Sequence, residues 1–148
     1  AGEPVLVLGG GSNVVVPDDG FPGLVVRDVR TGIEVEDAGA CGGASITVPA
    51  GTPWVDVVDR AVAEGWVGVE ALKRSLRDDD GAWSRWAPTP RWVVLEVGFQ
   101  LRLGSLSAPI AYAELARRLG VEVGQRAPLA EVRAAVLELR AGKGMVLD

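Results

Sequence analysis

Hydrophobic and polar residues follow two different spacings along this chain, and the change between them divides it. Up to about residue 52, short runs of β-branched and aliphatic residues alternate with glycine, proline and aspartate, which is typical of strands joined by tight turns. The runs that predict strands are residues 4–8, 14–16, 24–27, 33–36 and 45–49. The first part of the chain is therefore expected to be rich in β-sheet.

A helical spacing of apolar residues begins after Thr52. Thr52 suits the N-cap position, Pro53 suits the first helical position, and Gly65 is expected to end the helix. The predicted apolar stripe consists of Trp54, Val58, Ala61 and Val62, and the side chains expected to face water are Asp56, Asp59, Arg60 and Glu64. The pattern predicts one amphipathic helix.

The remainder of the chain predicts a linker, one strand and two helices. Residues 73–91 are charged, contain prolines and lack periodicity, which indicates a loop. Alternation over residues 91–103 predicts a half-buried strand whose apolar face carries Val93, Leu95, Val97, Phe99, Leu101 and Leu103. Helices are predicted over 111–119, before Gly120, and over 128–140, before Gly142, where Leu129, Val132, Val136 and Leu139 have helical spacing.

This order of elements predicts an α+β fold in two lobes. We expect a first lobe over residues 1–72, a linker and strand over 73–104, and a second lobe over 105–148. With 148 residues, 48% of them hydrophobic, the chain is long enough to bury a core.

Composition narrows the possible chemistry. A net charge of -5 argues against a nucleic-acid surface, which would need clustered Lys and Arg. No apolar run approaches the roughly 20 residues of a membrane-spanning helix, and no signal peptide is recognisable, so we expect a cytoplasmic protein. The absence of histidine excludes Ser-His-Asp and Cys-His catalysis and histidine metal sites. Cys41 is expected to be buried, so any redox chemistry would come from a cofactor.

Residues 5–20 read VLVLGGGSNVVVPDDG and place a glycine-rich turn between two apolar runs. Such a turn exposes successive N–H groups that can bind an anion such as phosphate, but the same residues also form ordinary hairpin turns. A dinucleotide-binding turn needs a helix after its glycines, and a P-loop needs a lysine. An apolar run without lysine follows here, so both of those motifs are excluded. The candidate anion-binding residues are Gly9, Gly10, Gly11, Ser12 and Asn13.

Five segments in order resemble the UDP-N-acetylenolpyruvoylglucosamine reductases, also called UDP-N-acetylmuramate dehydrogenases. They read LVLGGGSNVVVPDDGFPGLVV, TVPAGTPWVDVVDRAVAEGWVGVEAL, PRWVVLEVGFQLR, LSAPIAYAELARRLGV and LRAGKGMVLD. The most specific parts are GGGSN followed by an apolar run, and the AG-x-x-W start of the predicted helix. The resemblance covers most of the chain.

The resemblance implies a fold and a reaction. The N-terminal part would be an FAD-binding lobe of the vanillyl-alcohol-oxidase type, with residues 9–13 around the flavin diphosphate. In the family, NADPH reduces FAD, the flavin passes hydride to the enolpyruvyl double bond of the UDP-sugar, and a serine protonates the adjacent carbon. Tyr112 and Lys143 match family positions that contact the substrate diphosphate. By themselves, Tyr112 is also an ordinary packing residue, and Lys143 also suits a helix C-terminus.

The chain also departs from the family pattern. In the family, a GVEAL-like segment continues into a second glycine-rich stretch of the flavin site, whereas Leu72 is followed here by Lys73-Arg-Ser75. Arg74 is the nearest counterpart of the catalytic arginine, but it stands one place off, with Lys73 at the expected spacing. The sequence ends before the family's proton-donating serine. We therefore expect this shortened form to be inactive, and the alternative is a non-enzymatic structural or interaction domain.

Overall fold

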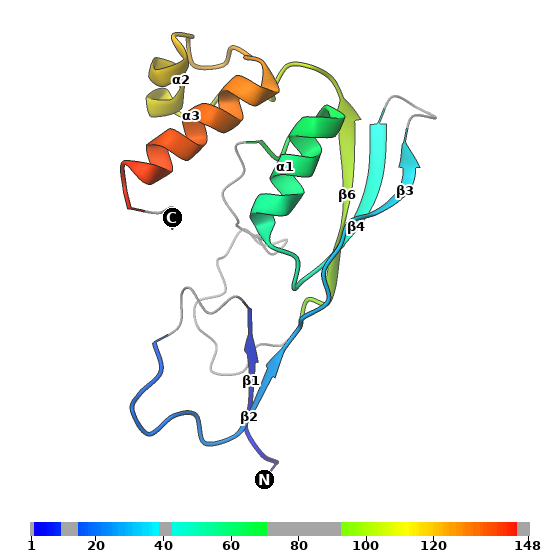
Figure 1. The fold of residues 1–148 in the computed structure, drawn as a ribbon, viewed down its shortest axis with the longest axis vertical. Helices are drawn as coiled ribbons and strands as arrows, with labels where there is room; N and C mark the ends of the chain where they lie inside the picture. Colours follow the sequence, from blue (N-terminus) through cyan, green and yellow to red (C-terminus); the bar gives the residue numbers. More distant parts are fainter. Residues whose placement is uncertain (1, 10–14, 39–42, 71–92, 145–148) are drawn as a thin grey trace.

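The computed structural model describes residues 2–9, 15–38, 43–70 and 93–144. Two sheets and three helices make up this part of the chain (Figure 1). A two-stranded parallel sheet pairs β1 (Val5–Leu8) with β2 (Leu24–Arg27). The α+β class expected from the sequence is confirmed.

A four-stranded antiparallel sheet forms the centre of the molecule, with strand order β3-β4-β6-β5. Its central pair joins Gly43 to Arg102 at one end and Pro49 to Glu96 at the other. The strands are β3 (Glu34–Ala38), β4 (Gly43–Pro49), β5 (Trp66–Val67) and β6 (Glu96–Leu103).

The helix α1 (Trp54–Glu64) packs on this sheet and forms the larger core. Every second residue of β4 is buried, as one covered face requires. The residues that make up this core are Ala44, Ile46, Val48, Val57, Ala61, Trp66, Val69 and Leu101. Trp54 and Phe99 pack against it, with ring centroids 5.9 Å apart.

A second core lies between α2 (Ala113–Leu119) and α3 (Leu129–Ala141), toward the opposite end of the long axis from β1 and β2 (Figure 1). It consists of Ile110, Leu115, Ala116, Ala127, Val132 and Ala135. The Arg133 side chain is mostly buried and pairs with Asp59 of α1 at 2.8 Å, which joins the two cores. None of the helices in the described residues is long and apolar enough to cross a membrane.

The three predicted helices are confirmed, and each is followed directly by the predicted glycine. Gly65 and Gly120 end α1 and α2 in the left-handed conformation, with φ of 70° and 67°. Gly142 follows α3 directly, although its φ of -61° is right-handed. Of the predicted α1 stripe, Val58 and Ala61 are buried and Val62 is half-buried. Val57, which is not in the predicted stripe, is buried as well.

Other local predictions are wrong. Thr52 does not cap α1, because its hydroxyl bonds Gly32 instead and the cap position is Pro53. The predicted strand over 91–103 begins at Glu96, and Val93 and Leu95 are exposed. Val15 and Val16 lie outside any strand, and the short strand β5 is absent from the sequence predictions. Val14, Cys41 and the predicted linker over 73–91 lie outside the described residues.

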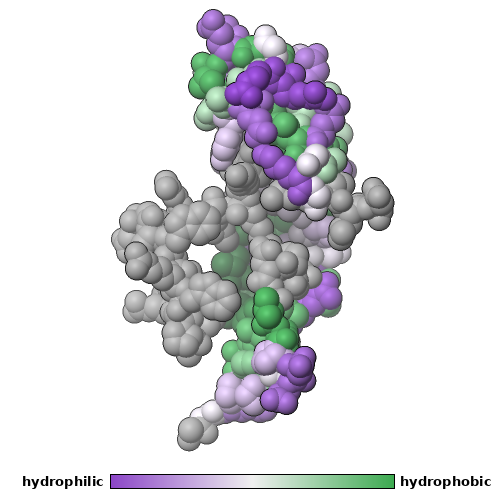
Figure 2. Space-filling view, turned by 90° about the vertical axis from the view of Figure 1, so that its left-hand side faces the viewer, coloured by the Kyte–Doolittle hydropathy of each residue, from purple (hydrophilic) through white to green (hydrophobic). Residues whose placement is uncertain are grey.

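Exposure of apolar side chains is uneven over the surface. All four residues of β2 are exposed, including Leu24, Val25 and Val26. Figure 2 shows green apolar surface in the lower half of the molecule and a mixed, largely purple surface at the end formed by α2 and α3. The two-stranded sheet is thus less buried than the four-stranded sheet.

Candidate functional site

The candidate flavin-binding loop begins where β1 ends. Gly9 follows Leu8 directly and forms a bend, and Leu8 pairs with Arg27, the last residue of β2. Ligands of parallel sheets bind beyond the carboxyl ends of the strands, which is where Gly9 lies. The other four candidate residues, Gly10 to Asn13, lie outside the described residues.

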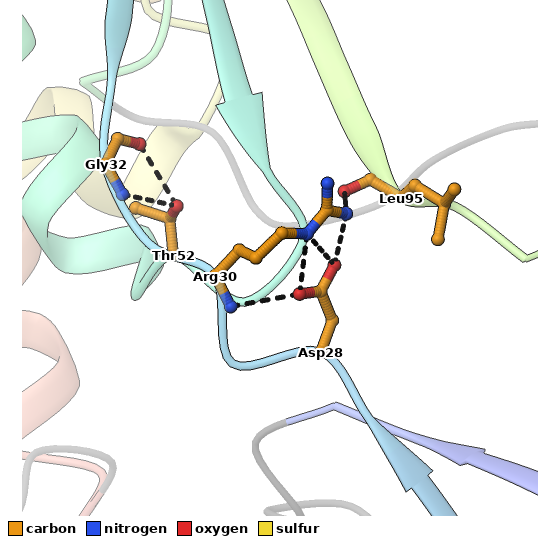
Figure 3. A network of polar contacts seen from close by, with 5 residues as sticks. All are labelled: Asp28, Arg30, Gly32, Thr52 and Leu95. Carbon is orange, nitrogen blue, oxygen red and sulfur yellow. Dashed lines mark hydrogen bonds and ion pairs between the residues drawn. The ribbon is translucent and has the colours of Figure 1, made fainter.

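A group of polar contacts, here called the junction, connects the two sheets (Figure 3). The Asp28 carboxylate accepts hydrogen bonds from the backbone N–H of Arg30 and from its guanidinium, with the shortest at 2.6 Å. The same guanidinium donates to the carbonyl of Leu95 at 3.0 Å. The Thr52 hydroxyl accepts from the N–H of Gly32 and donates to its carbonyl. Three segments that are distant in sequence therefore meet just beyond β2.

The junction is also sterically tight. A Cβ added to Gly51 would lie 2.5 Å from the carbonyl oxygen of Asp28 and 2.6 Å from that of Arg30. These atoms belong to the backbone and cannot swing aside as a flexible side chain would. The AG-x-x-W motif therefore contains a glycine that close backbone packing requires.

Electrostatics at the junction favour the charged carboxylate. The hydrogen bonds from the Arg30 side chain, followed by that from its backbone, lower the pKa of Asp28 to about 2. The same side-chain hydrogen bond raises the pKa of Arg30. Both groups are therefore charged at neutral pH.

The two candidate substrate-binding residues come from α2 and α3. Tyr112 directly precedes α2, and its side chain is about half-exposed. Lys143 lies just after α3, and its Nζ is 2.7 Å from a carboxylate oxygen of Glu114 in the first turn of α2. The fold thus holds Lys143 against Glu114, which follows Tyr112 by two residues in sequence. A phosphate group could use a lysine here as a point charge.

A buried carboxylate joins the end of β5 to the loop before α2. Glu70 is 3% exposed, and its two oxygens accept hydrogen bonds from the N–H of Gly68 at 2.6 Å and of Ala108 at 2.7 Å. The neighbouring Ser107, also buried, donates its hydroxyl to the Ala108 carbonyl and accepts from the N–H of Ala127. These bonds position the loop that leads to Tyr112.

The structure places the candidate residues in two groups. β1, which leads into Gly9, lies toward the opposite end of the long axis from α2 and α3 (Figure 1). Tyr112 and Lys143 belong to the other end, and Arg74 lies outside the described residues. Glu70 and Glu114 were not singled out from the sequence. A polar residue inside the apolar run WVGVEAL is a usable signal for Glu70, whereas only the folded contact identifies Glu114.

Comparison with known proteins identifies similar chains along the whole sequence. A UDP-N-acetylenolpyruvoylglucosamine reductase from Cutibacterium acnes is 41% identical, over 99% of this chain and 50% of its own length. Proteins of the same name from Salinispora arenicola and Thermobifida fusca are 40% and 37% identical, over 99% and 100% of this chain and 52% and 53% of their own lengths. No protein-family model matches the sequence.

Two facts about length accompany these similarities. The chain spans about half the length of the curated relatives that it matches. The span aligned with the Cutibacterium acnes protein is 190 residues, which exceeds the 148 residues of the whole chain. That relative therefore has residues inside the aligned span for which this chain has no counterpart.

Proposed function

Because this chain is a relative of the UDP-N-acetylenolpyruvoylglucosamine reductases and spans about half of their length, we propose that it binds a UDP-linked sugar used in peptidoglycan precursor synthesis. The complete reaction reduces UDP-N-acetylenolpyruvoylglucosamine to UDP-N-acetylmuramate with FAD and NADPH. The observation that carries the proposal is similarity over at least 99% of the chain, at 36–41% identity. The cytoplasmic location stays a prediction.

We assign the flavin site to the N-terminal part of the chain, as part of a lobe of the vanillyl-alcohol-oxidase type. The diphosphate would be held by the backbone N–H groups of residues 9–13, because glycines allow the backbone to approach closely. The place of Gly9 at the carboxyl end of β1 supports this assignment. A bound flavin reduced by NADPH would supply the hydride, which no side chain of this protein can.

We assign the substrate diphosphate to the C-terminal part of the chain, over residues 105–148. Lys143 would contribute its positive charge, and Tyr112 would donate its phenolic hydroxyl to a phosphate oxygen. Residues 1–72 would form the partial flavin lobe, with 73–104 as the connection. The contact between Lys143 and α2 supports a shared site for the two residues.

We also propose that the chain binds the UDP-sugar but does not catalyse its reduction. The residues that the relative has and this chain lacks are assigned to the second glycine-rich stretch, which would follow Leu72. The catalytic arginine is displaced to Arg74 or replaced by Lys73. Loss of preorganised charge stabilisation costs on the order of 10²–10³-fold in rate, and an incomplete flavin site leaves nothing for the remaining residues to assist.

Flavin binding is tested by titrating the protein with FAD. Gly10→Val should abolish binding, because a branched side chain blocks close approach to the backbone. Gly98→Val is the matched control, since a Cβ at Gly98 meets nothing within 4 Å and a β-branched residue suits a strand. Equal affinity in the Gly10 variant and the parent would remove the loop from the site. A parent that binds no flavin would favour the alternative, a non-enzymatic structural or interaction domain.

Turnover is tested by following NADPH oxidation with the enolpyruvyl UDP-sugar and excess FAD. We expect no substrate-dependent oxidation above a control without protein. Oxidation well above that control would refute the proposed inactivity and would point to Arg74, Ser75 or another residue in the missing roles.

Substrate binding is tested by calorimetric titration with the same UDP-sugar. We expect weak binding that declines with added salt, because a half-exposed charge is screened by ions. Lys143→Ala should weaken it further. Unchanged affinity in that variant would show that Lys143 is not part of the site.

A further inference from the structure

The ion pair between Lys143 and Glu114 has a direct bearing on anion binding. Lys143 Nζ donates a hydrogen bond to Glu114 Oε2 at 2.7 Å, and both side chains are about half-exposed. The charge that would attract a phosphate is therefore already partly neutralised by a carboxylate of the protein. An anion approaching Lys143 must displace Glu114 or lie beside its negative charge.

Displacement costs little, because an exposed ion pair contributes only about 0–1 kcal/mol to stability. Repulsion has the larger effect when a diphosphate with several negative charges comes near a carboxylate that stays in place. Both effects act in the same direction, since each lowers the affinity of Lys143 for phosphate. Neither effect prevents binding.

We propose that Glu114 is an internal competitor for the substrate diphosphate, which pairs with Lys143 in the free protein and is released from it when the UDP-sugar binds. This inference rests on the proposed function, because it assigns a regulating residue to the same site. Glu114 thereby sets the affinity of the site and favours ligands with enough negative charge to displace it. A monoanionic ligand would gain less from Lys143 than a diphosphate.

A second ion pair between the same helices supplies a matched control. Arg118 of α2 pairs with Glu138 of α3, and their exposures are close to those of Lys143 and Glu114. Arg118 follows Glu114 by one helical turn, and Glu138 precedes Lys143 by a similar interval. Glu138→Gln therefore weakens an equivalent link between α2 and α3 by the same loss of charge, while leaving Lys143 and Glu114 unchanged.

The test is a calorimetric titration of the full chain with UDP-N-acetylenolpyruvoylglucosamine at low salt. Glu114→Gln should bind roughly three- to tenfold more tightly than the parent, because it replaces the ion pair with a weaker neutral contact and removes a repelling charge. Glu138→Gln should bind as the parent does. In the Lys143→Ala background, Glu114→Gln should give a much smaller gain, which a double-mutant cycle measures. Thermal unfolding of each variant verifies that it is folded.

The possible outcomes distinguish a failure of this inference from a failure of the proposed function. If the parent binds and Glu114→Gln does not bind more tightly, the competition is refuted and the proposed function stands. An equal gain in affinity in Glu138→Gln would mean that looser packing of α2 on α3 causes the effect. An undiminished gain in the Lys143→Ala background would mean that general charge repulsion causes it. Either result refutes the inference. If no variant binds the UDP-sugar, the proposed substrate site fails, and the inference fails with it.

Discussion

β2 and β6 both carry apolar side chains, yet they differ in what covers them. β2 reads LVVR, and all four of its residues are exposed. β6 lies between β4 and β5, and its Leu101 is 7% exposed in the core beneath α1. The difference lies in the partner layer, because a sheet face becomes a core only when another element packs on it. An apolar run that forms a strand is therefore not by itself a prediction of burial.

The largest expected effect uses the same substitution in both strands. Leu101→Ala should lower the free energy of unfolding by about 3 kcal/mol, because it leaves a cavity in the core. Leu24→Ala, at a side chain that is 53% exposed, should change it by less than about 0.5 kcal/mol. Urea unfolding of the two variants measures both values. Similar losses would mean that β2 is covered in solution.

The next effect concerns the junction between the two sheets. Gly51→Ala should destabilise the protein by about 2 kcal/mol, because the new methyl group would overlap two backbone carbonyl oxygens. Gly98→Ala is the control, since nothing lies within 4 Å of a Cβ there. Thermal unfolding compares the two. A harmless Gly51→Ala would show that residues 28–30 can move away from the start of α1 at little cost.

A smaller effect is expected within the well-packed region. Glu70→Gln should cost about 1.5 kcal/mol, because the amide nitrogen cannot accept one of the two buried N–H hydrogen bonds. Glu36→Gln changes an exposed carboxylate that bonds Ser45 and Thr47 and should have little effect. Amide hydrogen exchange at Ala108 provides a local readout. Unchanged protection there would contradict a role for Glu70 in holding the loop before α2.

The smallest effect is the pH dependence of the Asp28–Arg30 ion pair at the junction. The folded state lowers the pKa of Asp28 to about 2, so its pairing with Arg30 stabilises the protein above about pH 4. That contribution is lost as the pH falls from about 4 to about 2. Acid unfolding of Asp28→Asn should therefore differ from the parent above this range and converge with it below. A constant difference down to pH 2 would contradict the assignment.

The elements were predictable where local chemistry decides them. Gly65 and Gly120 end their helices because a left-handed residue is needed there, and glycine adopts that conformation readily. Thr52 was mispredicted because a tertiary contact with Gly32 competes with capping, and no local rule contains that contact. Val93 and Leu95 continue the alternation of β6, but the paired part of β6 begins only at Glu96, opposite Pro49.

The candidate site likewise contains residues that the sequence identifies and one that only the fold identifies. Tyr112 and Lys143 were identified by resemblance, and their nearness depends on how α2 packs against α3. Glu114 carries no signal in the sequence, because an exposed glutamate in the first turn of a helix is ordinary. Its significance comes from the distance to Lys143, which only the folded chain defines.

The order of the central sheet has a consequence for synthesis on the ribosome. β4 pairs with β6, although α1, β5 and the segment after them separate the two in sequence. Until Leu103 has left the exit tunnel, β4 has no partner on that edge, and the apolar face that it shares with α1 is only partly covered. Contacts this distant in sequence form slowly, so the nascent chain spends part of its synthesis with an open strand edge that can pair wrongly. The interval before β6 emerges is therefore the stage of synthesis at which the open edge of β4 can pair wrongly.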